Sequence, residues 1–560
     1  MQALLGCWIL LGCWILMTTR VAAEIQVRTH GMVASGHPLA TQAGLDALQS
    51  GGNAIDAAVA VGLTLGVVDG HNSGIGGGCF LLIRLANEDF VAIDGRERAP
   101  SAATRDMYLR DGKADTKLSQ TGPLASGVPG EIAAFEYVVN HFGKKKFSEL
   151  LLPAAKLAED GFPIGRIYAS RLKNATDDLS RFDASRSVFF PDGKLLEEGN
   201  LLRQKDLGTT YRAIAEQGSD WFYRGGFAKA TEEWMKANGG IMTAKDFSDY
   251  KIEYRVPIQT TYRGHTIVSF PPPSSGGVHV AQMLNILEHF DLKNCDDATR
   301  IHLIAEAMKL AFADRAFWLG DPDYVKVPRG LVTTNYATSL AKKIDRDRAT
   351  PVAGHNIPEA ASDDVFQDKH TTHFSIADAE GNWVACTATV NTGFGSKVIV
   401  PGTGVILNNE MDDFSTQPGV ANYFGLIGAE ANAVAPGKRP LSSMSPTIVL
   451  KDGTPVIAVG AAGGPRIISA VLQELVAMLE LGQSPEQAIA ATRIHQQWSP
   501  DELMFESQMP ASLRAALVKR GHRLKELTSS STSQIVARSP DGKGFVGAAD
   551  PRGGGSAAGW

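Results

Sequence analysis

Helical and strand patterns occupy different parts of this sequence, which predicts an α+β fold. From residue 31 to about residue 350 the apolar residues recur mostly at helical spacing. After residue 370 two alternating stretches, each interrupted by a turn signal, are typical of β-hairpins. Runs of helices followed by runs of strands are the pattern of an α+β protein.

The N-terminal third begins with residues 31–68, which we predict to be helical. Ala40–Leu48 carries apolar residues at helical spacing, and two glycines end that run. The next run, Ala54–Val68, is apolar nearly all round and therefore predicts a buried helix. A glycine-rich loop at 74–78 follows this helix and leads into a strand-like run at 80–83.

This glycine loop does not bind a dinucleotide, because that fingerprint needs a strand before the loop and a helix after it. The sequence contains neither a phosphate-binding Gly-Lys-Ser/Thr motif nor a His-Glu-x-x-His zinc motif. A net charge of -6 over 560 residues also gives no basic surface for nucleic acid. Outside the leader three widely spaced cysteines, Cys79, Cys295 and Cys386, do not indicate a disulfide framework.

The first residues have the composition of an export signal. Ala3–Met17 is an apolar run of signal length, and the small residues at 21–23 precede Glu24. We therefore predict a signal peptide over 1–23 and a periplasmic or secreted protein without a membrane span. A lipid anchor at Cys13 is the alternative, since a Leu-Leu-Gly-Cys run ends there.

Two segments of the middle region bear on the site. One stripe of an amphipathic helix spans 301–312, and we interpret that helix as structural. Residues 354–370 lose all periodicity and are polar, which predicts an exposed segment without a regular element.

Directly after this segment the chain forms the first predicted hairpin. Residues 371–378 alternate like a strand, 378–382 form a turn, and 383–389 form a second strand. Folding the hairpin about the centre of the turn places Thr371 opposite Thr389, and a bulge would shift that register by one residue.

A second hairpin folds about an Asp-Gly turn at 452–453. The far ends of its arms bring Ser442 and Ser443 beside Gly463. Gly463 and Gly464 then precede a predicted helix that continues to Leu479, so their amides lie at the positive end of a helix dipole.

These pieces could perform nucleophilic catalysis by an N-terminal threonine. Cleavage between His370 and Thr371 would give Thr371 a free α-amine, whose reference pKa of about 7.7–8.0 suits a general base near neutral pH. Thr389 could hydrogen-bond the Thr371 hydroxyl, and Gly463 and Gly464 could form an oxyanion hole. Each feature alone is weak evidence for this chemistry, because threonines in strands and glycines in turns are common.

Together, however, the motifs resemble the γ-glutamyltransferases (γ-glutamyltranspeptidases), which are N-terminal-nucleophile hydrolases. The resemblance covers about residues 27–560, and the motifs stand in the order of that family. They are Gly31-Met-Val-Ala-Ser, Gly51-Gly-Asn-Ala-Ile-Asp-Ala-Ala, Arg96-Glu-Arg-Ala-Pro, Thr371-Thr-His-Phe-Ser, Thr389-Val-Asn, Leu407-Asn-Asn-Glu-Met-Asp-Asp-Phe, Arg439-Pro-Leu-Ser-Ser-Met-Ser-Pro, Gly463-Gly and Gly547-Ala-Ala-Asp-Pro-Arg-Gly-Gly.

The resemblance implies a four-layer αββα sandwich formed jointly by a large subunit, 24–370, and a small catalytic subunit, 371–560. It implies a self-processing enzyme that transfers the γ-glutamyl group of glutathione, or of a related donor, to water, amino acids or short peptides. The mechanism needs no metal or organic cofactor. Higher assembly and the ratio of hydrolysis to transfer are left open.

The resemblance also implies a role for each site residue. His370–Thr371 would be the cleaved bond and Thr371 the nucleophile. A guanidinium and hydroxyls suit the donor's α-carboxylate, and carboxylates with an amide suit its α-amino group. The implied roles are thus assistance to Thr371 by Thr389, an oxyanion hole of Gly463 and Gly464, carboxylate binding by Arg96, Ser442 and Ser443, and amine binding by Asn391, Glu410 and Asp413.

Two departures from the family pattern concern the surroundings of the pocket. Residues 69–73 lack the His-Pro that members often carry there, and Phe424 stands where members with a lid often have a tyrosine. Neighbouring Tyr423 is a candidate substitute. A γ-glutamyl-type acylase and a poly-γ-glutamate transpeptidase on the same fold are the alternative enzymes, and a non-catalytic exported binding protein is the alternative of another class.

Overall fold

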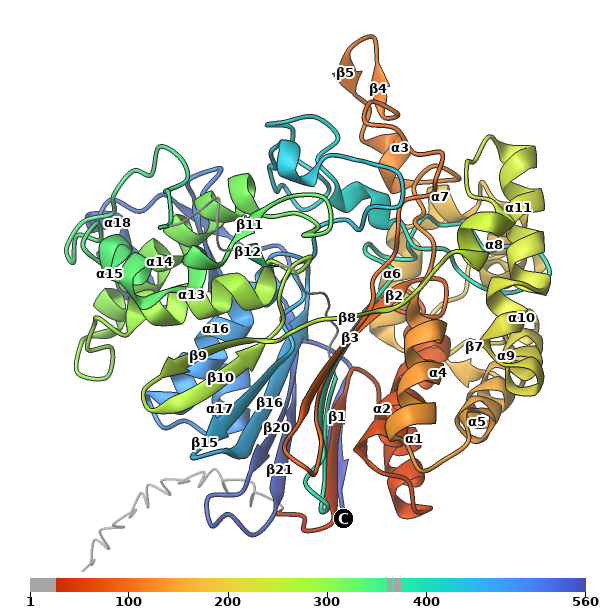
Figure 1. Ribbon diagram of the computed structural model, residues 1–560, viewed down its shortest axis with the longest axis horizontal. Coiled ribbons are helices and arrows are strands. Elements are labelled where there is room, and N and C mark those ends of the chain that lie inside the picture. Colours follow the sequence, from red (N-terminus) through yellow and green to blue (C-terminus); the bar gives the residue numbers. More distant parts are fainter. Residues whose placement is uncertain (1–26, 360–364, 367–373) are drawn as a thin grey trace, which may run out of the picture.

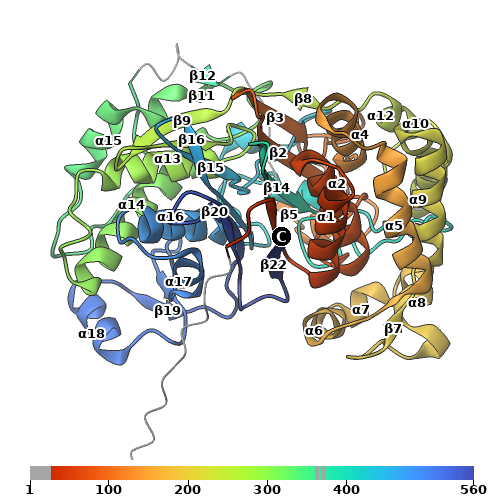
Figure 2. The same cartoon turned by 90° about the horizontal axis from the view of Figure 1, so that it is seen from below.

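Two antiparallel sheets lie at the centre of the molecule, with helices outside each of them (Figures 1 and 2). The structure is a computed structural model, and it describes residues 27–359, 365–366 and 374–560. One sheet has seven strands in the order β22 (Ser556–Gly559), β1 (Gly31–Ser35), β13 (Ser375–Asp378), β14 (Trp383–Thr389), β2 (Gly78–Arg84), β3 (Phe90–Gly95) and β8 (Glu253–Tyr254). The other has six strands in the order β21 (Phe545–Ala549), β20 (Thr532–Arg538), β16 (Thr454–Ala462), β15 (Thr447–Lys451), β10 (His265–Ser269) and β9 (Ile258–Tyr262).

The sheets face each other because successive side chains of a strand point to opposite faces. In β1, Met32 and Ala34 pack between the sheets, whereas Val33 packs under the helices of the seven-stranded sheet. Trp383 of β14 and Ile448 of β15 belong to the same buried cluster between the sheets. Both faces of each sheet are therefore covered, and apolar burial holds the layers together.

The helices outside the seven-stranded sheet come from the N-terminal half of the chain. As predicted, α2 is a buried helix: all of its residues are buried, and Asn53 caps it in a capping box with Asp56. The α-helices of this half are α1 (Pro38–Gln49), α2 (Ala54–Val68), α3 (Lys117–Gln120), α4 (Glu131–Phe142), α5 (Phe147–Asp160), α6 (Arg166–Asn174), α7 (Thr176–Leu179), α8 (Asp183–Phe189), α9 (Lys205–Gln217), α10 (Ser219–Tyr223), α11 (Gly226–Asn238) and α12 (Ala244–Ser248).

The helices outside the six-stranded sheet come from both sides of residue 370, and this layer lies on the left in Figure 1. They are α13 (Gly276–Leu287), α14 (Asp297–Trp318), α15 (Thr334–Ala341), α16 (Arg466–Leu479), α17 (Pro485–Ala490) and α18 (Ala511–Lys519). Within the described residues we find no helix with the length and apolar character needed to cross a bilayer.

Both predicted hairpins are present. β13 and β14 pair with Ser375 opposite Ala385, which is the predicted register, although Thr371 itself lies outside the described residues. β15 and β16 are joined by a turn in which Asp452 and Gly453 have φ angles of 50° and 79°. Two successive positive φ angles match the right-handed twist of a hairpin, which is why an Asp-Gly pair predicts this turn.

Three sequence predictions about local structure were wrong. Residues 31–35 form strand β1 rather than a helix, because a short run that is buried on both faces shows no alternation. The segment 354–370 contains a short strand, β12 (Val365–Phe366), which pairs with β11 (Val327–Pro328). The stripe at 301–312 belongs to α14, which is buried on all sides from His302 to Arg315 rather than being amphipathic.

Candidate active site

A cavity of about 180 Å³ lies where β14 and β16, one strand from each sheet, come to an end. Every predicted site residue within the described part of the chain lines it: Arg96, Thr389, Asn391, Glu410, Asp413, Ser442, Ser443, Gly463 and Gly464. His370 and Thr371 lie outside the described residues. The cavity thus brings together segments that are more than three hundred residues apart in the chain.

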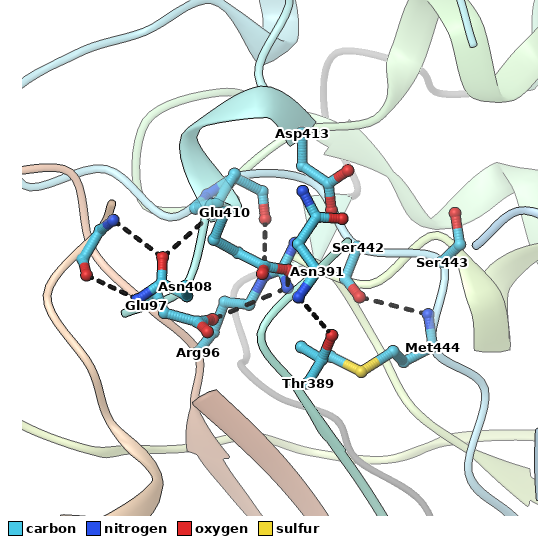
Figure 3. A network of polar contacts seen from close by, with 12 residues as sticks. Arg96, Glu97, Thr389, Asn391, Asn408, Glu410, Asp413, Ser442, Ser443 and Met444 are labelled. Atoms are coloured by element: carbon cyan, nitrogen blue, oxygen red, sulfur yellow. Dashed lines mark hydrogen bonds and ion pairs between the residues drawn. The ribbon is translucent and has the colours of Figure 1, made fainter. Parts of the chain in front are cut away.

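Thr389 is the last residue of β14, and its side chain faces the cavity (Figure 3). Its Oγ1 accepts a hydrogen bond of 2.8 Å from the backbone N–H of Asn391. Because that N–H can only donate, the Thr389 hydroxyl proton is available for another acceptor. Asn391 has a φ of 75°, and its Nδ2 donates to the carbonyl of Asn409 at 2.9 Å, so its amide is held at the cavity wall.

Gly463 and Gly464 form a sharp bend between β16 and α16. Their φ angles are 138° and 61°, a region that favours glycine. A Cβ on Gly463 would lie 2.9 Å from Cα of Ser531, and one on Gly464 would lie 2.5 Å from the ring of Phe424. Backbone conformation and lack of space therefore both require glycine here, and the bend sits at the N-terminal end of α16.

One wall of the cavity, which we call the charged half, is a cluster of three carboxyl groups around one guanidinium (Figure 3). Arg96 follows β3 and is buried. Its Nη1 contacts Glu410 and lies 3.7 Å from Glu97, and its Nη2 donates to Oδ2 of Asp413 at 2.7 Å. Its Nε donates to the carbonyl of Pro440 at 3.2 Å. Full ionisation would leave the cluster with an excess of negative charge.

Burial shapes the pKa values in this half of the cavity. It raises the pKa of Glu97 to about 8, although attraction to Arg96 opposes the shift. Burial likewise raises the pKa of Glu410 and of Asp413, again against the effect of Arg96. Burial disfavours the charged form of Arg96 itself, but Glu410, Asp413 and Glu97 outweigh that effect and raise its pKa.

The adjoining wall carries Ser442 and Ser443, whose segment receives hydrogen bonds from Arg96 at the carbonyls of Pro440 and Leu441. Oγ of Ser442 accepts from the backbone N–H of Met444 at 3.2 Å, and Oγ of Ser443 accepts from a guanidinium N–H of Arg315 at 3.1 Å. We call this wall the serine half: Ser442, Ser443 and the groups behind them, Ser275 and Arg315.

Comparison with known proteins identifies the family. The gamma-glutamyltranspeptidase profile matches residues 40–560. The chain belongs to this family. The glutathione hydrolase proenzyme of Escherichia coli (strain K12) is 44% identical over 527 residues, which cover 93% of this chain and 90% of the relative. The resemblance predicted from the motifs is therefore confirmed, and the chain is an enzyme of the gamma-glutamyltranspeptidase type.

Acylases are also among the relatives. The acylase ACY 1 proenzyme of Pseudomonas sp. (strain SE83) is 38% identical over 92% of this chain and 91% of its own length. A cephalosporin acylase from Bacillus halodurans superposes with a TM-score of 0.84 at 29% identity, over 96% of this chain and 97% of its own. The gamma-glutamyltranspeptidase of Helicobacter pylori superposes with a TM-score of 0.56 at 42% identity, over 59% of this chain and 94% of its own. These structures support the coarser part of the α+β prediction, a fold that combines helices with β-sheets.

Several residues behind the cavity were missed by the sequence analysis. Asn408 lies inside a motif quoted for the family, and its Oδ1 accepts from the backbone N–H of Gly127 at 2.9 Å and of Glu410 at 3.0 Å. Glu97 lies beside Arg96 in another motif, yet no role was assigned to it. Arg315 lies on a helix interpreted as purely structural; one charged residue in a helical stripe carries no local signal of its distant partners.

The two aromatic residues at the departure from the family pattern both line the cavity. The ring of Phe424 packs on Gly464, and Tyr423 is 59% exposed. The backbone N–H of Tyr423 donates to Asp412 at 2.9 Å, which fixes the segment beside the charged half. Phe424 lacks the hydroxyl that a tyrosine would bring, so its contribution here is packing alone.

One group of side chains has the composition of a metal site among the described residues: His302, Glu306 and His522. Nδ1 of His302 and Nε2 of His522 are 2.8 Å apart and hydrogen-bond each other. The ammonium of Lys309 lies 3.0 Å from Oε1 of Glu306. The two imidazoles thus bond each other and the carboxylate pairs with the ammonium of Lys309, so these ligand atoms already interact with protein groups.

Proposed function

We propose that this protein is a self-processing γ-glutamyltransferase and hydrolase that uses Thr371 as its N-terminal nucleophile. The observation that carries the proposal is the convergence of groups in one cavity. Residues assigned to donor binding, to the oxyanion hole and to assistance of the threonine all line it, and they come from both sides of residue 371.

The proposed processing step is an intramolecular acyl transfer. The Thr371 hydroxyl attacks the carbonyl of His370, the peptide C–N bond breaks, and the resulting ester is hydrolysed by water. This releases the carboxylate of His370 and the free α-amine of Thr371. That amine then serves as the base for the Thr371 hydroxyl, since its reference pKa of about 7.7–8.0 lies near neutral pH.

In catalysis the Thr371 oxygen attacks the γ-carbonyl of glutathione or of another γ-glutamyl donor, and the amine leaves with a proton. Water, an amino acid or a short peptide then takes the glutamyl group from the ester. Thr389, whose hydroxyl proton is free, donates to the Thr371 oxygen. Gly463 and Gly464 stabilise the oxyanion at the N-terminal end of α16, where small residues and the helix dipole both favour negative charge.

The two halves of the cavity match the two charges of a free amino-acid head. An ammonium group suits the charged half, where Glu410 and Asp413 outnumber their single arginine and Asn391 adds an amide. An α-carboxylate suits Ser442 and Ser443, together with Arg96. A donor lacking either charge would leave groups of the cavity unpaired, which gives selectivity for a γ-glutamyl head.

We also propose that the mature fold is a four-layer αββα sandwich shared by subunits 24–370 and 371–560. Within the seven-stranded sheet, β13 and β14 from the second segment lie between β1 and β2 from the first. Within the six-stranded sheet, β15 pairs with β10 in the same way. Cleavage at 370–371 would cut one peptide bond and leave these ladders intact, so the subunits would stay together. Export through a signal peptide over 1–23, which lies outside the described residues, completes the proposal.

The acylases among the relatives favour one alternative function, a γ-glutamyl-type acylase that accepts donors without a free α-amino group. The charged half of the cavity argues against it, because Glu410 and Asp413 would face a neutral or anionic acyl group. Transfer of γ-glutamyl groups from p-nitroanilide, compared with transfer of glutaryl groups, which lack the amine, separates the two functions.

The first test is intact mass and N-terminal sequencing of the purified wild-type protein after incubation at neutral pH. Two chains, one beginning Thr-Thr-His-Phe-Ser, together with turnover of γ-glutamyl-p-nitroanilide, are the expected result. A single stable chain without turnover would contradict the proposal. Two chains that prefer the glutaryl donor would support the acylase.

A further inference from the structure

A second buried arginine, Arg315, lies behind the serine half of the cavity. It projects from the C-terminal part of α14, and its side chain makes two hydrogen bonds with hydroxyl groups. Nε donates to Oγ of Ser275 at 2.9 Å, and Nη2 donates to Oγ of Ser443 at 3.1 Å. No carboxylate of a described residue forms an ion pair with it, although Asp413 is close enough to attract its charge.

Arg315 also acts on Ser442, through Ser275 at the start of α13. Oγ of Ser275 donates to the carbonyl of Ser442 at 2.7 Å, and the backbone N–H of Ser275 donates to the same carbonyl at 2.8 Å. The backbone N–H of Ser442 donates in turn to the carbonyl of Pro273 at 2.8 Å. Residues 273–275 thus hydrogen-bond both the N–H and the carbonyl of Ser442, and Arg315 fixes the orientation of Ser275.

The direction of these hydrogen bonds decides what the serines can bind. A guanidinium and a backbone N–H can only donate, so Oγ of Ser443 and Oγ of Ser442 must each act as an acceptor toward the protein. Each serine hydroxyl has one proton, and that proton is left to point elsewhere. Since both side chains line the cavity, the serine half presents two O–H donors to whatever enters it.

Two O–H donors in one cavity, with an arginine behind them, favour an anion. Burial lowers the pKa of Arg315 to about 10, which still leaves it protonated at neutral pH. Its positive charge lies behind the hydroxyls and strengthens them as donors toward a negatively charged acceptor. A carboxylate would therefore bind here more strongly than a neutral amide of the same shape.

We propose that Arg315 is a positioning residue for recognition of the donor's α-carboxylate: it fixes the Ser443 hydroxyl directly, and the Ser442 segment through Ser275, as donors toward that group. Arg315 does not touch the substrate in this role, and it is distinct from Arg96 in the charged half. The inference rests on the proposed γ-glutamyl function and adds the residue that orders the carboxylate-binding wall.

The test compares two donors that differ only in the α-carboxylate. These are γ-glutamyl-p-nitroanilide and 4-aminobutyryl-p-nitroanilide, assayed with the wild type and with Arg315→Met. We expect Arg315→Met to raise KM for the γ-glutamyl donor about tenfold, the effect of one weakened charge-assisted hydrogen bond. We expect kcat to change less than about threefold, and kcat/KM for the 4-aminobutyryl donor to stay close to the wild-type value.

Two further variants distinguish positioning from a loss of structure. Arg315→Lys keeps the charge and one donor, so its KM for the γ-glutamyl donor should lie between those of the wild type and Arg315→Met. Lys309→Met removes another buried cation of α14, one that pairs with Glu306 and Asp501 away from the cavity, and should leave both KM values unchanged. In a double-mutant cycle, Arg315→Met and Ser443→Ala should be less than additive, because both remove the Arg315–Ser443 hydrogen bond, while the effect of Arg315 through Ser275 remains separate.

An equal loss of kcat/KM on both donors, or an Arg315→Met enzyme with an unchanged γ-glutamyl KM, would overturn the inference. If Arg315→Met does not fold, the inference would also be overturned by a wild-type γ-glutamyl KM in both Arg315→Lys and Ser275→Ala. Absence of γ-glutamyl turnover in the wild type would instead contradict the proposed function itself, so the two failures are distinguishable.

Discussion

In the charged half of the cavity three carboxyl groups share the guanidinium of Arg96, whereas in the serine half the guanidinium of Arg315 holds neutral hydroxyl groups. The first arrangement is rich in carboxyl groups, and several of their oxygens have no hydrogen-bond donor: both oxygens of Glu97 and Oε2 of Glu410. The second has surplus positive charge behind groups that are satisfied by one another. Arginine therefore holds carboxyl groups in one half and neutral hydroxyl groups in the other.

This difference would let one cavity bind both charges of the proposed donor head. Asp413 pairs with Arg96 and is also attracted by Arg315, so the two halves adjoin at this carboxyl group. Carboxyl groups gather around Arg96 and hydroxyl groups around Arg315, so the cavity offers an acceptor-rich region beside a donor-rich one. The cost is a set of buried charged groups that depend on one another.

The largest expected effect comes from removing the proposed nucleophile, the hydroxyl of Thr371. Thr371→Ala should remain a single uncut chain, and its activity should fall by at least about 10⁴-fold, because the attacking oxygen is lost while the rest of the site is retained. Intact mass and γ-glutamyl-p-nitroanilide hydrolysis measure both. Thr371→Ser, which keeps a hydroxyl, should still be cut, and a cut, active alanine variant would refute the assignment.

The next largest effect is expected when the guanidinium of the charged half is removed. Arg96→Met leaves Glu97, Glu410 and Asp413 buried without their shared cation, which should cost about 3–5 kcal/mol of unfolding free energy and raise the donor KM. Urea denaturation and donor kinetics check the two effects, and self-cleavage should persist. Arg96→Lys serves as the control that retains the charge. Unaltered donor kinetics in Arg96→Met would remove this arginine from the pocket.

A pair of matched variants would sharpen the comparison between the two halves. Asp413→Asn should weaken kcat/KM for γ-glutamyl-p-nitroanilide about 10- to 100-fold, but should have little effect on the glutaryl donor, which lacks the amine. Ser443→Ala should weaken the γ-glutamyl donor similarly and spare the 4-aminobutyryl donor, which lacks the carboxylate. If each variant weakened all donors equally, the division into an amine wall and a carboxylate wall would be wrong.

The smallest expected effect is a pH dependence of stability confined to the charged half. The pKa of Glu97 is raised to about 8 from 4.5. The unfolded chain therefore loses this proton first, and the stabilising contribution, complete at low pH, is lost as pH rises from about 4.5 to about 8. Glu97→Gln cannot ionise, so its unfolding free energy should fall less than that of the wild type over that window. Parallel curves for wild type and variant would contradict this.

The sequence by itself determined the elements whose causes are local. The Asp-Gly turn at 452–453, the buried helix Ala54–Val68 and the pairing of β13 with β14 follow from glycine conformation, apolar periodicity and strand alternation. The cavity residues themselves were predicted through ordered motifs that resemble one family, and the comparisons confirm that family.

Only the tertiary structure decided which charges meet. Arg96 contacts Glu410 across more than three hundred residues, and Arg315 reaches Ser443 from a helix whose own pattern shows no partner. Strand β1 was mistaken for a helix for the same reason, since burial on both faces depends on what the sheet packs against. Periodicity reports only which side of an element is apolar. The partner of a buried charge is set by the packing of distant elements, and no local pattern in the sequence encodes it.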